Sequence, residues 1–309
     1  MKIAVVVPTY NEADHISDVV KGIPSFVDFV VVVDDASTDQ TTVIVKEMYD
    51  PRLNYLRNEK RMGVGGAVLL GHETALSLGS DIDVVMAGDN QMDPRYLPRL
   101  LDAIVDQGYD YAKGNRFLKS DHLRGMPTQR VFGSYVLTFL TKFASGYWQI
   151  FDPQNGYTAL RMSAYPLLDT SHIAKGYQFE NDMLIHLNVI GARAKDVPMP
   201  SRYGSEVSGI RMITFAPRTA WFLLRRSWWR FHKKYLVADF HPIAPLSFLG
   251  LPLFLWGVLY SLYLVYDRYF YAKHTVPSSG TVMVAVVPLF IGFQMVLTAL
   301  LMDVNESRS

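Results

Sequence analysis

The sequence predicts an α/β protein with a mostly parallel sheet, followed by a membrane-anchoring C-terminal region. In the first 110 residues, short apolar runs alternate with amphipathic stretches, which is the pattern of consecutive βαβ units. Polar and acidic residues directly follow several of these runs, at the sheet edge where open α/β proteins bind ligands. Near the end of the chain, two long segments carry no charged residue.

The strands and helices follow from the periodicity of the apolar residues. Continuous apolar or β-branched runs predict strands at residues 3–7, 29–33, 53–56, 82–86 and 109–112, as expected for strands buried on both faces. Helices are predicted between them at residues 13–21, 41–48, 64–78 and 96–106. The less regular region that follows predicts helices at 128–143 and 179–190 and a strand at 192–197. We assign residues 1–210 to one domain.

The C-terminal region, residues 241–309, is predicted to form two transmembrane helices. Residues 243–266 and 281–302 are uncharged, and each segment is long enough to span ~30 Å of hydrocarbon. Two buried helices of a soluble core are the alternative. Lys and Arg residues are more frequent before the first segment than in the loop between the two. The positive-inside rule therefore places the large domain on the cytoplasmic face.

Residues 211–240 are interpreted as juxtamembrane amphipathic helices. Trp, Phe and Leu are interleaved with Arg and Lys in this segment, which suits a helix lying in the lipid headgroup layer. A helix packed against the protein core is the alternative. The net charge is only +1, but basic residues are concentrated in residues 111–145 and 201–235. Next to an apolar C-terminus, this distribution favours phosphate or anionic lipid over nucleic acid as a partner.

The absence of cysteine and the character of the N-terminal segment exclude several kinds of site and signal. The chain contains no cysteine, which excludes disulfides, thiolate nucleophiles and cysteine-ligated metals. The N-terminus lacks the basic segment, long apolar run and small-residue cleavage site of a signal peptide.

The segment after the fourth predicted strand carries a candidate metal site. Asp89 and Gln91 are two residues apart and can reach one hard cation such as Mg²⁺ or Mn²⁺. A cation held there can neutralise a diphosphate leaving group. Ala87 stands where a second carboxylate would be expected.

Two further polar loops, residues 8–12 and 34–39, are predicted at the same edge of the sheet. They offer acceptors for the N–H groups of a nucleotide base and carboxylates for ribose hydroxyls. Residues 37–39 alone could be helix caps. Three acidic loops on one edge are harder to explain in that way, because clustered carboxylates repel unless they meet a cation or hydrogen-bond donors.

These motifs together resemble those of a family 2 inverting nucleotide-sugar glycosyltransferase with the GT-A fold. The resemblance is closest to the polyprenyl-phosphate glycosyltransferases, the group that contains the dolichol-phosphate mannose synthases, and it covers about residues 1–210. The segments that carry it are Val-Pro-Thr-Tyr-Asn-Glu at 7–12, Val-Asp-Asp-Ala-Ser-Thr-Asp at 33–39, Asp-Asn-Gln-Met-Asp-Pro at 89–94, Gly-Asn-Arg-Phe at 114–117, Asp-Pro-Gln-Asn-Gly-Tyr at 152–157 and Arg-Tyr-Gly-Ser-Glu-Val-Ser at 202–208.

The resemblance implies a role for each matching residue. The positions that hold the nucleotide sugar are Pro8, Tyr10, Glu12, Asp35, Asp89, Asn90, Gln91 and Arg202, with Asp89 and Gln91 also binding the metal. The positions that receive the lipid phosphate are Arg116, Arg130 and Ser134. Guanidinium groups suit this role because they bind phosphate bidentately. Asp152 is the remaining carboxylate in a motif and is expected to orient the sugar or the acceptor. The expected catalytic set is Asp89, Arg116, Arg130 and Asp152.

The implied reaction is hexose transfer from UDP-glucose or GDP-mannose to a dolichyl or undecaprenyl phosphate, with inversion and with Mg²⁺ or Mn²⁺ as cofactor. Two alternatives stay open. One is transfer to another membrane lipid or to a polysaccharide. The other, suggested by Ala87, is a non-catalytic membrane subunit that binds a sugar nucleotide. Homo-oligomerisation through the membrane hairpin also stays open.

Overall fold

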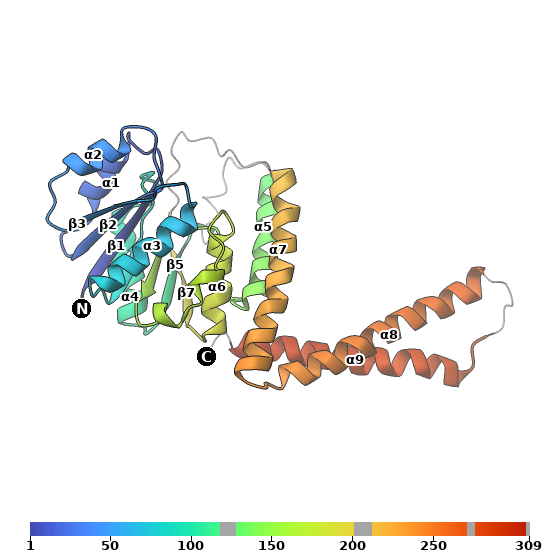
Figure 1. Ribbon diagram of the computed structural model, residues 1–309. Coiled ribbons are helices and arrows are strands. Elements are labelled where there is room, and N and C mark those ends of the chain that lie inside the picture. The colour runs from blue at the N-terminus through green and yellow to red at the C-terminus, as the bar shows by residue number, and fades with distance from the viewer. Residues whose placement is uncertain (118–127, 201–211, 271–275, 307–309) are drawn as a thin grey trace. The chain divides into compact units, whose positions relative to one another are not determined.

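The computed structural model describes residues 1–117, 128–200, 212–270 and 276–306, with side chains except at 128–134 and 212–216. The chain divides into two compact units, Met1–Arg230 and Phe231–Ser309. Figure 1 shows the sheet and helices of the first unit and the long helices of the second.

A seven-stranded sheet with the order β3-β2-β1-β4-β6-β5-β7 forms the centre of the first unit. All neighbouring strands are parallel except at β6, which runs antiparallel to β4 and β5. The prediction of a mostly parallel sheet is therefore confirmed. The strands are β1 (Ile3–Thr9), β2 (Phe29–Asp34), β3 (Leu53–Arg57), β4 (Ile82–Val85), β5 (Tyr111–Asn115), β6 (Thr158–Arg161) and β7 (Ala194–Pro198).

Strand β6 was not predicted from the sequence. It has only four residues, too few for an alternating pattern to be distinguished from a loop. Its pairing with β4 and β5 places the segment before it, residues 152–157, near the carboxyl end of β4.

Helices cover both faces of the sheet, because the central strands are apolar on both sides. Residues on one face of β1 and β2 pack with α1 (Ile16–Gly22), α2 (Thr41–Glu47) and α4 (Leu97–Val105). Alternate residues of the same strands pack with α3 (Val64–Ser77) on the opposite face. Gly71 allows α3 to approach closely, since a Cβ there would lie 2.1 Å from Val6 Cγ1.

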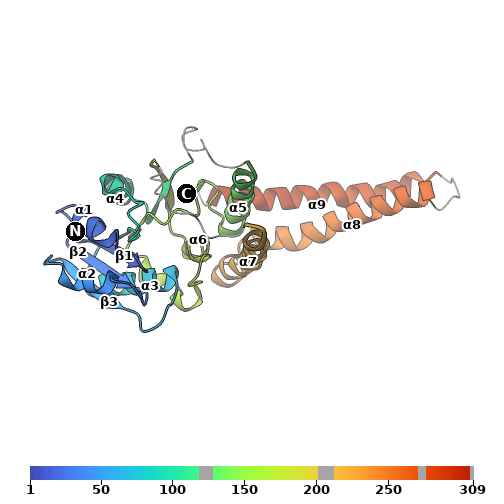
Figure 2. The same ribbon diagram turned by 90° about the horizontal axis from the view of Figure 1, so that it is seen from above.

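Three further helices pack together beside the sheet. Helices α5 (Thr128–Ser145), α6 (Phe179–Val189) and α7 (Met212–His232) share an apolar cluster that includes Ala144, Ile185 and Leu223. Helices α5 and α7 lie side by side in both views (Figures 1 and 2). The prediction of helices in these three regions is confirmed, with ends that differ by a few residues.

The second unit contains a helical hairpin. A π-helical turn, Lys233–Ala238, precedes α8 (Ile243–Phe270) and α9 (Ser279–Glu306). Both long helices could cross a membrane, judged by length and composition. They pack closely through glycines: a Cβ on Gly292 would lie 2.2 Å from the backbone nitrogen of Phe254. Tyr235 donates a hydrogen bond to the buried Asp303 of α9.

Candidate active site

Three polar loops meet at the carboxyl edge of the sheet, as predicted. The Gly88 N–H donates to the carbonyl of Pro8 at 3.1 Å, and the Asp35 N–H donates to the carbonyl of Thr9 at 2.9 Å. Gly88 makes the first contact sterically feasible, since a Cβ there would lie 2.8 Å from Thr9 Oγ1. The loops after β2 and β4 are therefore joined through their backbones to the end of β1.

Each of these loops contains one residue in the left-handed backbone region. Asn11, Ala36 and Asn90 have φ values of 56°, 63° and 58°. Asn adopts this conformation readily, whereas for Ala36 it costs about 1 kcal/mol. Backbone strain of this kind often clusters at functional sites. Asn90, predicted to bind the nucleotide sugar, therefore has a backbone conformation that shapes the Asp89–Gln91 turn.

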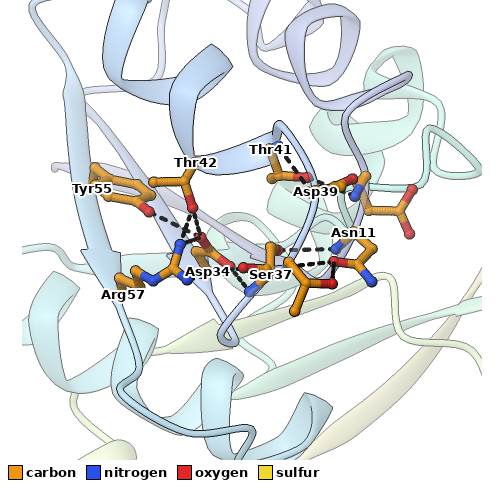
Figure 3. A network of polar contacts seen from close by, with 10 residues as sticks. Asn11, Asp34, Ser37, Asp39, Thr41, Thr42, Tyr55 and Arg57 are labelled. Atoms are coloured by element: carbon orange, nitrogen blue, oxygen red, sulfur yellow. Dashed lines mark hydrogen bonds and ion pairs between the residues drawn. The ribbon is translucent and has the colours of Figure 1, made fainter.

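Asp34 organises the loop after β2 from within the protein. Its side chain accepts hydrogen bonds from Ser37 N at 2.7 Å, Thr42 Oγ1 at 2.6 Å and Tyr55 Oη at 2.9 Å, and it pairs with Arg57 (Figure 3). Burial alone would raise the pKa of Asp34, but these hydrogen bonds hold it below its usual value. The Asp34 side chain is fully buried, so its role is structural.

Asp35 fixes the loop between β3 and α3. Its carboxylate accepts from Asn58 Nδ2 at 2.8 Å and from the backbone N–H groups of Met62 and Gly63 at 2.7 and 2.8 Å. This loop brings the guanidinium of Arg61 over the ring of Tyr10, 3.8 Å from its centroid. Tyr10 is one of the residues predicted from its motif to hold the nucleotide sugar, whereas no motif pointed to Arg61, which is distant in sequence.

A cavity of about 210 Å³ lies beside these loops. It is lined by residues from the β4 loop, the segment before β6 and the ends of β5 and β7: Asp89, Gln91, Met92, Asp93, Tyr96, Arg116, Gln154, Asn155, Gly156, Tyr157, Met199 and Pro200. Three of the predicted residues, Asp89, Gln91 and Arg116, therefore share one cavity.

The cavity wall around Asp89 has the chemistry of a site for a hard cation. Asp89 supplies a carboxylate and Gln91 an amide oxygen, and the Gln91 N–H donates to Asp89 Oδ1 at 3.0 Å. The Ala87 N–H donates to the sulfur of Met92 at 3.2 Å, so an apolar side chain adjoins Ala87. No cluster of three His, Cys, Asp or Glu side chains that could hold a metal occurs among the described residues. The donor set fits Mg²⁺ or Mn²⁺ only if water and phosphate oxygens supply most ligands.

Arg116 is held in a fixed orientation by Asp152. Its Nε and Nη2 atoms donate to the two carboxylate oxygens at 2.7 and 3.0 Å, and its backbone N–H also donates to Asp152 Oδ2 at 3.1 Å. Asp152 is fully buried, whereas about a third of the Arg116 side chain is exposed. The arrangement favours an orienting role for Asp152 over direct contact with a substrate.

A buried ion pair holds one of the segments that line the cavity. Lys113 Nζ donates to Glu180 Oε2 at 2.8 Å and to the carbonyl of Asn155. Burial alone would lower the pKa of Lys113, but the charge and hydrogen bond of Glu180, together with Tyr111 and Asp152, outweigh it and hold the pKa above its ordinary value. The pair therefore anchors the segment that carries Asn155 and Gly156.

Comparison with known proteins identifies the family. The model of the family described as "Glycosyl transferase family 2" matches residues 4–167. The chain belongs to this family. The resemblance inferred from the motifs is thereby confirmed, and the matched residues include the three polar loops, Arg116 and Asp152.

Relatives with named activities support a closer grouping. The chain is 28% identical over 216 residues to the UDP-N-acetylglucosamine–dolichyl-phosphate N-acetylglucosaminyltransferase of Methanococcus voltae, covering 65% of this chain and 86% of that enzyme. It is 32% identical over 203 residues to the polyprenol monophosphomannose synthase of Mycolicibacterium smegmatis, covering 63% and 75%. These names confirm the likeness to polyprenyl-phosphate glycosyltransferases.

A solved structure confirms the fold. Glucosyl-3-phosphoglycerate synthase from Mycobacterium tuberculosis, in complex with Mn²⁺, UDP-glucose and phosphoglyceric acid, superposes with a TM-score of 0.55. The sequence identity is 20%, and the match covers 73% of this chain and 79% of that enzyme. The predicted GT-A architecture of the first unit is therefore confirmed.

The remaining predicted residues divide into two groups. Pro8 lies at the end of β1 and Glu12 in the loop that follows, where the Glu12 N–H donates to Thr41 Oγ1 at 2.9 Å. Arg202 and the side chains of Arg130 and Ser134 lie outside the described residues, so their roles stay predictions. Sequence reasoning also missed the cavity residues Tyr96 and Met199, for which no local pattern gave a signal.

Proposed function

We propose that this protein transfers a hexose from a nucleoside diphosphate sugar to a polyprenyl phosphate, with inversion at the anomeric carbon. UDP-glucose and GDP-mannose are the proposed donors, and dolichyl or undecaprenyl phosphate is the proposed acceptor. The observation that carries this proposal is the shared cavity. Asp89 and Gln91 line it from the β4 loop, and the oriented Arg116 lines it from the end of β5.

The donor is proposed to occupy the loops after β1, β2 and β4. A nucleobase that binds beside the Tyr10 ring would also contact Arg61, because the guanidinium of Arg61 is stacked on that ring. Asp35 supports this region by holding the 58–63 loop. Pro8, Glu12, Asn90 and Arg202 complete the proposed donor site.

Asp89 and Gln91 are proposed to hold a divalent cation, Mg²⁺ or Mn²⁺. The solved relative crystallised with Mn²⁺ and UDP-glucose supports this for the fold. When bound, such an ion would stabilise the negative charge of the departing nucleoside diphosphate. With Ala87 in place of a carboxylate, Asp89 is the acidic ligand that this chain offers from the 87–89 segment.

The acceptor phosphate is proposed to bind at Arg116, together with Arg130 and Ser134. A phosphate oxygen attacks the anomeric carbon while the bond from that carbon to the diphosphate oxygen breaks, so one displacement inverts the configuration. A phosphate monoester is already anionic at neutral pH, and no protein base is needed. The contribution of the protein is therefore positioning and charge stabilisation. Arg116 binds the incoming phosphate, and the buried Asp152 keeps the guanidinium in place.

The hairpin is proposed to anchor the protein in a membrane, with the catalytic unit on the cytoplasmic face. The length and composition of α8 and α9 support the anchor, and the basic residues that precede α8 support the orientation. In this proposal, residues 1–210 form the catalytic domain, residues 211–240 form juxtamembrane helices at the membrane surface, and residues 241–309 form the membrane anchor. Homo-oligomerisation through the hairpin belongs to the same proposal.

The experiment that tests this function is a transfer assay with purified full-length protein in detergent. Radiolabelled UDP- and GDP-sugars are offered together with a polyprenyl phosphate, with Mg²⁺, with Mn²⁺ or with a chelator. We expect one donor to give an acid-labile lipid product, and the chelator to abolish it. Arg116→Gln, which removes the guanidinium, should lower turnover by about a hundredfold or more.

The control is the same assay with a diacylglycerol in place of the polyprenyl phosphate, where no product is expected. If product forms with diacylglycerol but not with the polyprenyl phosphate, the proposed acceptor is wrong. Nucleotide binding by calorimetry without transfer to any acceptor would contradict the proposal and favour a non-catalytic binding subunit.

A further inference from the structure

Asp196 of β7 is a carboxylate that the proposed reaction does not use directly. It lies beside β5, opposite Lys113 in the strand register. The residue is half-buried, yet its Oδ1 atom is shielded from solvent and has no hydrogen-bond partner among the residues that the structure describes. Burying a carboxylate oxygen in this way is costly, so a specific reason for its presence is expected.

The other oxygen of Asp196 connects two segments that are distant in sequence. Its Oδ2 accepts the backbone N–H of Phe151 at 2.6 Å and the side-chain amide of Asn115. Phe151 directly precedes Asp152, and Asn115 directly precedes Arg116. One carboxylate oxygen therefore holds both neighbours of the Arg116–Asp152 pair.

Asn115 extends the same network toward the far side of Arg116. Its Oδ1 accepts the backbone N–H of Phe117 at 2.8 Å. The backbone on both sides of Arg116 is thus tied to one side chain, and that side chain is tied to Asp196. Without Asp196, the Phe151 N–H and the Asn115 amide would each lose an acceptor, and a backbone shift there would move the guanidinium.

We propose that Asp196 is a positioning residue for the acceptor-phosphate site, holding Asn115 and Phe151 so that Asp152 can orient Arg116. This inference rests on the proposed function of Arg116 as a phosphate-binding residue. It predicts that losing Asp196 weakens use of the acceptor and leaves the donor site intact. Apart from Arg202, which follows β7 in the sequence, the proposed donor site is built from other segments, the end of β1 and the loops after β1, β2 and β4.

The test compares Asp196→Ala with wild type in the full-length protein, using the donor and acceptor that the transfer assay identifies for wild type. We expect kcat/KM for the polyprenyl phosphate to fall by about tenfold to a hundredfold, since a misplacement of about 1 Å has an effect of that size. The KM for the nucleotide sugar and the affinity for the nucleoside diphosphate should stay within about twofold, because the donor loops are unchanged.

Asp110→Ala is the matched control. Asp110 accepts the backbone N–H of Arg193 at 2.9 Å and so joins the same two strands at their other end. Its loss should affect stability but not the acceptor KM. Asn115→Ala probes the network from its other side and should reproduce the acceptor defect. Asp196→Asn retains an oxygen acceptor for Phe151 and should restore most of the activity that the Ala variant loses.

Three results would overturn the proposal. In the first, Asp196→Ala changes the acceptor kcat/KM no more than Asp110→Ala does. In the second, Asp196→Ala raises the donor KM as much as the acceptor KM. In the third, Asp196→Asn is as defective as the Ala variant, which would mean that the charge acts rather than the hydrogen bonds. If Asp196→Ala does not fold, Asn115→Ala decides between the first two results. Failure of wild type to transfer would instead refute the proposed function.

Discussion

At the scale of single residues, the carboxylates of this chain perform distinct tasks that the sequence motifs do not distinguish. Asp34 and Asp35 are adjacent, and each accepts at least three hydrogen bonds from protein donors. Asp89 faces the cavity. Asp152 holds the guanidinium of Arg116, and Asp196 holds the backbone of Phe151. Burial and partners, rather than residue type, separate these roles.

The pKa values of two of these carboxyl groups shift in opposite directions. Burial raises the pKa of Asp196 to about 7, and the nearby charge of Asp152 adds to this rise. Burial acts on Asp34 in the same sense, but its hydrogen bonds outweigh this effect and hold its pKa below the usual value. Asp34 therefore stabilises the fold above the unfolded-state pKa of about 3.9, and this stability is lost as the pH falls through its lowered folded-state pKa.

We expect Asp34→Asn to lower the free energy of unfolding by about 2–4 kcal/mol at pH 7, because Thr42, Tyr55 and Arg57 lose a buried ionised acceptor. The deficit relative to wild type should shrink as the pH falls below about 4. Chemical denaturation followed by circular dichroism at a series of pH values measures both effects. Asp169→Asn is the control: its carboxylate is half-exposed, so the change should be small. A deficit that does not change with pH would contradict this account.

At the scale of elements, α7 presents two different faces. Arg226 pairs with the buried Asp182 of α6 at 2.8 Å, and Trp229 packs against the ring of His186 at 4.5 Å between centroids. Trp221 and Trp228 are instead 72% and 60% exposed. One face of α7 therefore packs on the protein, as expected for a helix packed against the core. The opposite face is exposed, as expected for a helix in the lipid headgroup layer.

We expect the open face of α7 to lie in the lipid headgroup layer, where Trp side chains are favoured. Variants that each retain a single tryptophan, at 221, 228 or 229, can be reconstituted into vesicles containing lipids brominated near the headgroup. Bromine should quench fluorescence from Trp221 and Trp228 strongly. Trp229 provides the matched control on the same helix and should be protected. Equal quenching at all three positions would contradict an interfacial α7.

At the scale of the whole molecule, the first unit and the hairpin are stabilised by different means. The first unit buries apolar strands between helices. In the hairpin, large apolar side chains remain exposed along α8 and α9, and the two helices meet through glycine and alanine. Exposed apolar surface combined with close small-residue contacts is expected of helices that pack within lipid.

The proposed orientation can be tested because the chain lacks cysteine. A single Val276→Cys substitution places a thiol beside the loop between α8 and α9, where Val276 is 77% exposed. A single Lys21→Cys substitution places one on the surface of the first unit, where Lys21 is exposed. The cells are prepared so that the cytoplasmic membrane is intact and its outer face is accessible. A membrane-impermeant maleimide should then label the Val276→Cys variant at once and the Lys21→Cys variant only after permeabilisation. The reverse pattern would show the catalytic unit on the outer face.

The fold class, the hairpin and the edge of the sheet that carries the polar loops could all be predicted from the amino-acid sequence. Each follows from local regularities: apolar runs of strand length, uncharged segments of membrane length and polar residues at strand ends. The insertion of β6, the stacking of Arg61 on Tyr10 and the pairing of Arg116 with Asp152 became visible only in the folded structure. The same is true of the hydrogen bonds that join Asn115, Phe151 and Asp196. These contacts join residues 36 to 81 positions apart, and no local pattern encodes a contact that forms only when the sheet brings its strands together.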